Sequence, residues 1–203
     1  MGSDVPKQFL ELKGVAVIVH SIRAFQQYSP NINIVVVLPD GAVDHWTEIA
    51  KRYGIDAKTS IGGETRFESV KNGLELIDDG LVAVHDAARP LVTPALISQC
   101  FLVAEQEGNA VPVIPLTDSV RELSNDISRP AERERFRLVQ TPQVFEASLL
   151  KKAYEQAYRS SFTDDATVVE AFGAKIHLVD GDRSNIKITT KADMLIAKAL
   201  LPG

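Results

Sequence analysis

Short apolar segments alternate with helical patterns along almost the whole chain, and this alternation is what most limits the possible folds. The expected strands are nearly continuous apolar runs, which is typical of strands buried on both faces of a sheet. They occupy residues 32–38, 55–59, 81–85, 110–114 and 175–179. Repeated β–α units of this kind predict an α/β fold with a mostly parallel, Rossmann-like sheet that helices cover on both faces.

Local residue chemistry marks where the intervening helices begin and end. Thr93 followed by Pro94 predicts a helix start, and Gly108 predicts its end. The other helices are expected from about residue 15, at 43–54, around 70–74, at 147–158, at 164–172 and at 190–201. A chain of 203 residues suits one α/β domain spanning 1–203 better than two small ones.

The composition excludes several classes of partner. A net charge of -5 does not favour general binding to nucleic acids or anionic membranes, so any polyphosphate site must be built from a few local Lys and Arg residues. The sequence contains no apolar run of membrane-spanning length and no signal-peptide pattern. Cys100 is the only cysteine, which fits a reducing compartment. We therefore expect a cytoplasmic protein with no nucleic-acid or membrane partner.

Residues 118–139 interrupt the β–α pattern with a polar, arginine-rich segment. Apolar residues alternate on either side of a turn-rich centre, Ser124-Asn125-Asp126. This pattern predicts a β-hairpin arm that projects from the domain, with a mobile surface loop as the alternative. An arm without a core of its own usually packs on another molecule, so we expect a homodimer formed through it.

The segment 82–90 places polar residues at the end of a buried strand. There His85-Asp86-Ala87-Ala88-Arg89-Pro90 follows the apolar run, at the edge where open α/β sheets bind ligands. Asp86 offers an oxygen ligand for a hard cation such as Mg²⁺, and Arg89 offers a guanidinium fork for phosphate. A loop-capping aspartate paired with a surface arginine is the alternative for these two residues alone.

Several further segments suit phosphate or nucleotide chemistry. They are Pro6-Lys7-Gln8, Gly62-Gly63-Glu64-Thr65-Arg66, Gln140-Thr141-Pro142-Gln143, Phe162-Thr163-Asp164-Asp165-Ala166 and Asn185-Ile186-Lys187-Ile188-Thr189. In this order and spacing they closely resemble the 2-C-methyl-D-erythritol 4-phosphate cytidylyltransferase family of non-mevalonate isoprenoid synthesis. The resemblance runs from Pro6 to the last helix. It implies a nucleotidyltransferase fold, CTP and a sugar-alcohol phosphate as substrates, Mg²⁺, and a homodimer joined through the arm.

The resemblance also implies roles for individual residues. Lys7 would neutralise triphosphate charge, and Gly63, Glu64 and Ser69 would read cytosine and its ribose; Glu64 stands where some relatives have Asp. Asp86 would lie near the metal and the substrate hydroxyls, with Arg89 as a substrate-binding arginine. Thr141 and Lys187 would serve the methylerythritol phosphate and the α-phosphate. Arg133, at the base of the arm, would reach the partner subunit's active site, so that Lys7, Lys187 and Arg133 form the catalytic set.

Such a reaction needs cations rather than a general base. A sugar phosphate is already ionised at neutral pH, and the difficulty is to bring two polyanions together and stabilise an in-line transition state. We therefore do not expect His85 to act as a base; a strand-end histidine that holds the Asp86 loop by hydrogen bonds is the expected role.

One departure from the family pattern concerns the beginning of the chain. The family starts with an apolar strand and a glycine-rich loop that ends just before Pro-Lys-Gln, whereas this sequence starts at Met1-Gly2. The strand would be central in the sheet, so without it we expect a gap in the core, two rows of unpaired backbone groups and low activity. An incomplete chain is the favoured explanation.

Two other functions stay open from the sequence. A sister enzyme that makes CDP-ribitol from ribitol 5-phosphate would share the CTP half of the site, although Ala87-Ala88 looks like the methylerythritol enzymes, since the ribitol enzymes tend to carry Ser-Val there. A truncated chain that binds nucleotide without turnover is the second alternative. Binding of CTP without release of pyrophosphate would identify it.

Overall fold

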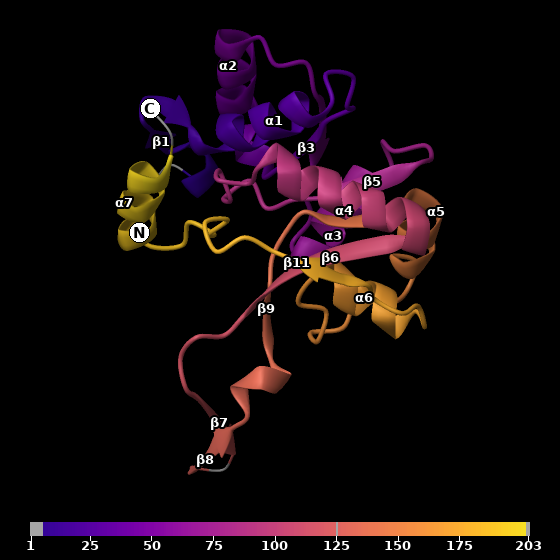
Figure 1. Ribbon diagram of the computed structural model, residues 1–203. Coiled ribbons are helices and arrows are strands. Elements are labelled where there is room, and N and C mark those ends of the chain that lie inside the picture. The colour runs from indigo at the N-terminus through magenta and orange to yellow at the C-terminus, as the bar shows by residue number, and fades with distance from the viewer. Residues whose placement is uncertain (1–5, 125, 202–203) are drawn as a thin grey trace.

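The computed structural model describes residues 6–124 and 126–201 (Figure 1). Its helices are α1 Val17–Tyr28, α2 Val43–Tyr53, α3 Arg66–Leu74, α4 Pro94–Glu107, α5 Ala147–Ala153, α6 Asp165–Ala171 and α7 Lys191–Leu200, with short 3-10 helices η1 Lys7–Phe9, η2 Asp40–Ala42 and η3 Arg133–Arg135. Its strands are β1 Glu11–Leu12, β2 Val15–Ala16, β3 Val35–Leu38, β4 Lys58–Ile61, β5 Leu81–Val84, β6 Asn109–Pro115, β7 Val120–Ser124, β8 Ile127–Ala131, β9 Arg137–Val139, β10 Gln143–Glu146 and β11 Leu178–Asp180.

The expected helix caps are present. The Thr93 hydroxyl accepts a hydrogen bond from the Leu96 amide at the start of α4, and Gly108 ends that helix in the left-handed conformation at φ 83°. Gly54 ends α2 in the same way at φ 61°. These local signals fix the helix boundaries before any tertiary contact is considered.

The main sheet has the strand order β11-β6-β10-β5, and β9 pairs with the far end of β6. Strands β6 and β11 are parallel, as are β3 and β4, whereas β10 runs antiparallel to both of its neighbours. The sheet is therefore mixed, because β10, which the sequence analysis did not identify, inserts between β5 and β6. The predicted Rossmann-like α/β class is confirmed.

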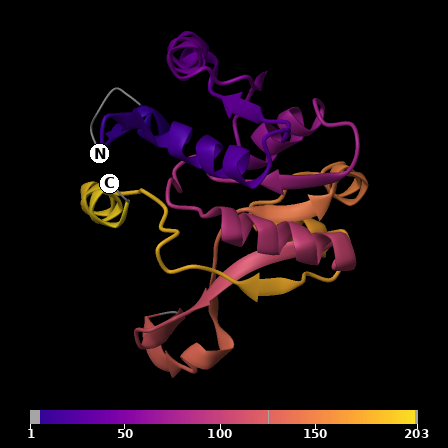
Figure 2. The same ribbon diagram turned by 45° about the horizontal axis from the view of Figure 1, so that its top comes forward.

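Helices cover both faces of this sheet (Figure 2). On β10, Val144 belongs to a core with α1 and α4, while the next residue, Phe145, belongs to a core with α3, α5 and α6. On β6, Ala110 belongs to the core with α1 and α4, and Val111 belongs to the core with α3, α5 and α6. Side chains two residues apart share a face, so each strand contributes to both layers.

A cavity of about 560 Å³ separates β3 from β5. Among the described residues, β3 pairs only with β4 and β5 pairs only with β10, so the β3–β4 pair forms no sheet with the rest. All residues of both strands line the cavity.

The arm projects from the body in both views (Figures 1 and 2). Strands β7 and β8 form an antiparallel hairpin with Ser124 opposite Ile127, while Asn125 of the expected turn lies outside the described residues. The predicted arm is too long at its C-terminal end, because β9 returns to the body and pairs with β6. The arm exposes large apolar side chains, including Leu123 at 78% and Phe136 at 47%.

Candidate active site

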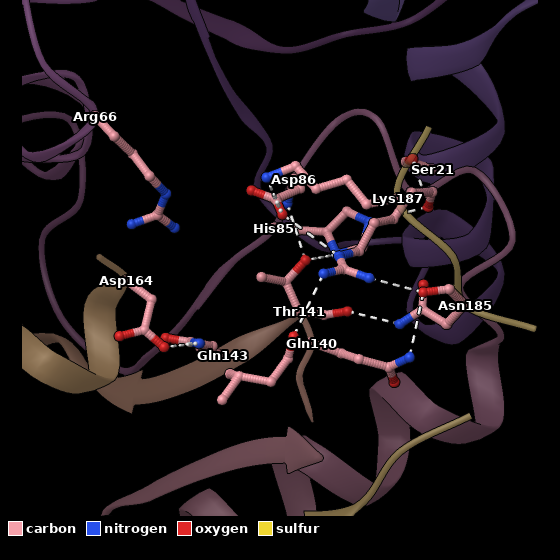
Figure 3. A network of polar contacts seen from close by, with 12 residues as sticks. Ser21, Arg66, His85, Asp86, Gln140, Thr141, Gln143, Asp164, Asn185 and Lys187 are labelled. Carbon is pink, nitrogen blue, oxygen red and sulfur yellow. Dashed lines mark hydrogen bonds and ion pairs between the residues drawn. The ribbon is translucent and has the colours of Figure 1, made fainter. Parts of the chain in front are cut away.

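Asp86 lies two residues beyond the end of β5 and is surrounded by cations (Figure 3). Its Oδ2 lies 3.0 Å from Lys187 Nζ and 3.4 Å from Arg89 Nε. Asp86 and Arg89 are largely buried, whereas 46% of the Lys187 side chain is exposed. Burial alone would raise the pKa of Asp86, but Lys187, Arg66 and Arg89 outweigh it and hold that pKa below its ordinary value.

Arg89 joins three segments that are far apart in the sequence. Its amide donates to the Asp86 carbonyl, which forms the turn, and its Nη1 donates to the Asn185 carbonyl at 2.8 Å. Asn185 is fully buried and donates from Nδ2 to the Thr141 carbonyl at 2.8 Å. The segments that carry Asp86, Thr141 and Lys187 are thereby brought together, as the sequence analysis expected.

A chain of hydrogen bonds through His85 supports the Asp86 loop. His85 Nε2 lies 3.2 Å from the Arg89 carbonyl, which can only accept, so Nε2 carries the proton. Nδ1 then accepts from the Thr141 hydroxyl at 3.1 Å, and the Thr141 oxygen accepts from the Asp86 amide at 3.0 Å. Neutral His85 and buried Thr141 therefore fix the position of the Asp86 backbone.

Burial lowers the pKa of His85 from 6.5 to about 4. The unfolded state binds the proton more readily, so this histidine's contribution to stability is complete above pH 6.5 and is lost as the pH falls. Between pH 7 and pH 5 the loss is about 2 kcal/mol. Urea titrations at the two pH values should show that difference for the wild type and a smaller one for His85→Asn; equal pH dependence would contradict a neutral buried His85.

Of the residues expected to read the nucleotide, Gly63 and Glu64 lie in the turn between β4 and α3, and Ser69 lies on α3. The Gly63 amide donates to Ser69 Oγ at 3.1 Å, and Ser69 Oγ donates to the Thr65 carbonyl at 2.9 Å. A Cβ at Gly63 would collide with Glu68, so this turn requires glycine. Ser69 lines the same cavity as Asp86, whereas the Glu64 side chain is exposed.

Two of the predicted catalytic residues lie apart from Asp86 in this chain. Lys7 is exposed on η1, beside Gln8, which lines the cavity. Arg133 belongs to the arm, where its Nη1 donates to the Thr117 carbonyl at 2.6 Å and its Nε pairs with Glu134 at 3.2 Å. The structure thus brings together Asp86, Arg89, Thr141 and Lys187, and it leaves Arg133 on a projecting element.

Sequence reasoning assigned no role to a second polar network beside the site. Gln143 donates to Asp164 at 2.8 Å, and the next residue, Asp165, is buried against Arg66 and Tyr154. The segments that contain Gln143 and Asp164-Asp165 were both recognised as motifs. The two adjacent carboxylates, Asp164 and Asp165, are the signal that could have identified the network. A buried carboxylate requires a partner, but its identity depends on the fold.

Among residues 6–124 and 126–201, no group of three or more His, Cys, Asp or Glu side chains is arranged to hold a metal ion. Asp86 is the carboxylate at the centre of the cation cluster, and both of its ion pairs use Oδ2. Mg²⁺ commonly binds one or two carboxylates together with substrate phosphates and water, so this donor set fits an ion that arrives with a nucleotide. In the same part of the chain, no helix is long and apolar enough to cross a membrane.

Comparisons with known proteins identify the family. The family model for 2-C-methyl-D-erythritol 4-phosphate cytidylyltransferase matches residues 1–202. Proteins of that name from Bacteroides fragilis and Porphyromonas gingivalis are 48% and 43% identical, over 99% of this chain and 93% and 91% of their own length. The crystal structure of the Thermus thermophilus cytidylyltransferase superposes with a TM-score of 0.84 at 37% identity, covering 96% of this chain and 93% of that one. The chain belongs to the 2-C-methyl-D-erythritol 4-phosphate cytidylyltransferase family.

Proposed function

We propose that the cluster of Asp86, Arg89, Thr141 and Lys187 is where this cytidylyltransferase joins CTP to 2-C-methyl-D-erythritol 4-phosphate and releases pyrophosphate. The observation that carries the proposal is the contact of Asp86 Oδ2 with both Lys187 and Arg89 at the end of β5. The two cations beside this carboxylate can bind two phosphate groups at one place. The site is open to solvent at Lys187, so the phosphates can reach it. The ribitol alternative is not favoured, because the matching family and relatives carry the methylerythritol name.

The reaction forms a bond between the acceptor phosphate oxygen and the α-phosphorus of CTP and breaks the bond to the pyrophosphate oxygen. Because the attacking phosphate is already ionised, no side chain has to remove a proton. Neutral His85, which is committed to the Arg89 carbonyl and Thr141, agrees with that requirement. The work of the site is positioning and charge stabilisation, and one fixed donor is worth about 3 kcal/mol.

We assign the residue roles by their position. Lys187 meets the transferring α-phosphate, Arg89 binds the acceptor, and Thr141 serves the acceptor side by holding the Asp86 loop. Gly63, Glu64 and Ser69 form the nucleotide side, where the turn between β4 and α3 presents backbone groups to cytosine and ribose. Lys7 neutralises triphosphate charge from η1.

Mg²⁺ is the proposed cofactor, and Asp86 is its protein ligand. Both ion pairs of Asp86 use Oδ2, so Oδ1 is the oxygen that can bind a cation. Bound there with the triphosphate, the ion would supply charge neutralisation for the transition state and the leaving pyrophosphate. The low pKa of Asp86 keeps this ligand ionised throughout the neutral range.

We further propose that residues 1–203 act as one nucleotidyltransferase domain in a cytoplasmic homodimer. The support for the dimer is the arm, whose exposed apolar residues lie on an element that projects from its own body. They are Leu123, Ile127 and Phe136, and Leu138 and Val139 are exposed on β9 at the base of the arm. Paired by a two-fold axis, two arms would cover each other and carry each Arg133 towards the partner's acceptor site.

Pyrophosphate release with CTP and Mg²⁺ tests the reaction and its acceptor. We expect turnover with 2-C-methyl-D-erythritol 4-phosphate to exceed turnover with ribitol 5-phosphate by at least tenfold, because the acceptor side of the site is that of the family. Reactions without acceptor give the background. Faster turnover of ribitol 5-phosphate would overturn the acceptor, and CTP binding without any pyrophosphate would identify a non-catalytic nucleotide-binding chain.

A further inference from the structure

Arg66 makes a buried ion pair beside the site. Its Nη1 donates to Asp165 Oδ1 at 2.9 Å and its Nη2 to Oδ2 at 2.6 Å, which is the bidentate geometry that a guanidinium allows. Tyr154 Oη donates to Asp165 Oδ1 at 2.6 Å. Asp165 is completely buried, and its carboxylate is therefore held by three hydrogen bonds in place of water.

The pair connects the N-termini of two helices, α3 and α6. Arg66 is the first residue of α3, directly after the turn that contains Gly63, and Thr65 caps this helix. Asp165 is the first residue of α6, and its neighbour Asp164 caps that helix. The ion pair therefore sets the distance between the nucleotide-side turn and the Asp164 segment.

The Asp164 segment is itself tied to the acceptor side. Gln143 donates from Nε2 to Asp164 Oδ2 at 2.8 Å, and its Oε1 accepts from the Ala166 amide at 2.9 Å. Gln143 is on β10, opposite Val84, and two residues beyond Thr141. One continuous set of contacts thus leads from the Gly63 turn through Arg66 and Asp165 to the strand that follows Thr141.

Arg66 is also close enough to Asp86 to act on it electrostatically. It contributes to the low pKa of Asp86, and it lines the cavity together with Ser69 and Asp86. Figure 3 shows Arg66 to one side of Asp86, with its guanidinium pointing towards the Asp164 side. The side chain is 36% exposed, so the ion pair is held from the buried side and borders the open site.

We propose that Arg66 is a positioning residue for cytidylyl transfer. Through Asp165 and Tyr154 it fixes the spacing between the nucleotide turn and the acceptor side across Asp86, so that the α-phosphate of CTP and the acceptor phosphate meet in line. The proposal rests on the function proposed above. It assigns Arg66 no contact with the reacting atoms.

The test is Arg66→Lys, which keeps the positive charge but cannot form two parallel hydrogen bonds to Asp165. We expect kcat/KM for both CTP and 2-C-methyl-D-erythritol 4-phosphate to fall at least tenfold in a protein that remains folded by circular dichroism. The matched control is Arg52→Lys, because Arg52 pairs with Glu11 at 4.0 Å on an exposed surface. It should leave both constants within twofold of the wild type.

A second variant removes the pair without leaving a buried charge. Arg66→Met combined with Asp165→Asn keeps a hydrogen-bond acceptor for Tyr154, and we expect the same loss in kcat/KM or a larger one. Wild-type kcat/KM in either folded variant would overturn the proposal, and so would unfolding of both variants, which would make the pair purely structural. The wild-type rate in the same assay tests the function itself, so the two failures are distinguishable.

Discussion

Replacing Lys187 with alanine should lower kcat by about a hundredfold or more while KM for CTP changes only a few-fold. Lys187 Nζ lies 3.0 Å from Asp86 Oδ2 and retains exposure towards the site, so its charge is available to a phosphate. A cation that meets the α-phosphate becomes more effective as charge develops in the transition state, and losing one such donor costs about 3 kcal/mol. Steady-state measurement of pyrophosphate release gives both constants.

Lys198→Ala is the matched control, since Lys198 is exposed on α7. It should leave kcat unchanged. If Lys187→Ala also keeps the wild-type kcat, then Lys187 is an ordinary surface lysine whose contact with Asp86 is structural. A large increase in KM with constant kcat would instead place Lys187 in ground-state binding.

Mixing two inactive homodimers should restore activity if Arg133 acts across the subunit interface. Arg133→Ala and Lys187→Ala are each expected to be nearly inactive, because each removes a cation from every site. In a mixed dimer, one site receives both defects and the other receives neither. Freshly exchanged mixtures should therefore regain up to a quarter of the wild-type activity, since half of the dimers are mixed and half of their sites are intact.

The control is the mixture of either variant with itself, which should stay inactive. Subunit exchange is demonstrated independently with two differently tagged preparations that co-purify. Inactive mixtures after proven exchange would show that Arg133 serves its own subunit. Its contacts with Thr117 and Glu134 would then describe its whole role.

The parts of the fold that depend on neighbouring residues were predictable from the sequence. Thr93, Pro94 and Gly108 mark both ends of α4 because caps are local interactions. Strand β10 was missed for the opposite reason: Gln143–Glu146 is only four residues long, and its position between β5 and β6 comes from partners more than thirty residues away. Antiparallel insertion of a short strand leaves no periodic pattern in its own segment.

The candidate site shows the same division. Asp86 and Arg89 could be predicted because they are three residues apart at the end of an apolar strand, and their ion pair is present. Arg66 and Asp165 could not be paired from the sequence, because they are 99 residues apart and only the packing of α3 near α6 brings them together. Residue chemistry identified the charged groups, while tertiary structure determined which charges are compensated.

Because no described ladder joins β3 to β5, we expect the part of the fold on the β3 side of the cavity to open as a cooperative unit. This unit contains β3, α1 and α2 around Trp46 and Ile49, with its own apolar cluster. Subglobal opening of such a unit breaks side-chain contacts but no sheet hydrogen bonds at the boundary, so it requires less free energy than global unfolding. Lys7 lies on this unit and Gly63 lies two residues beyond β4, so we expect nucleotide binding by these residues to be coupled to the closing of the unit.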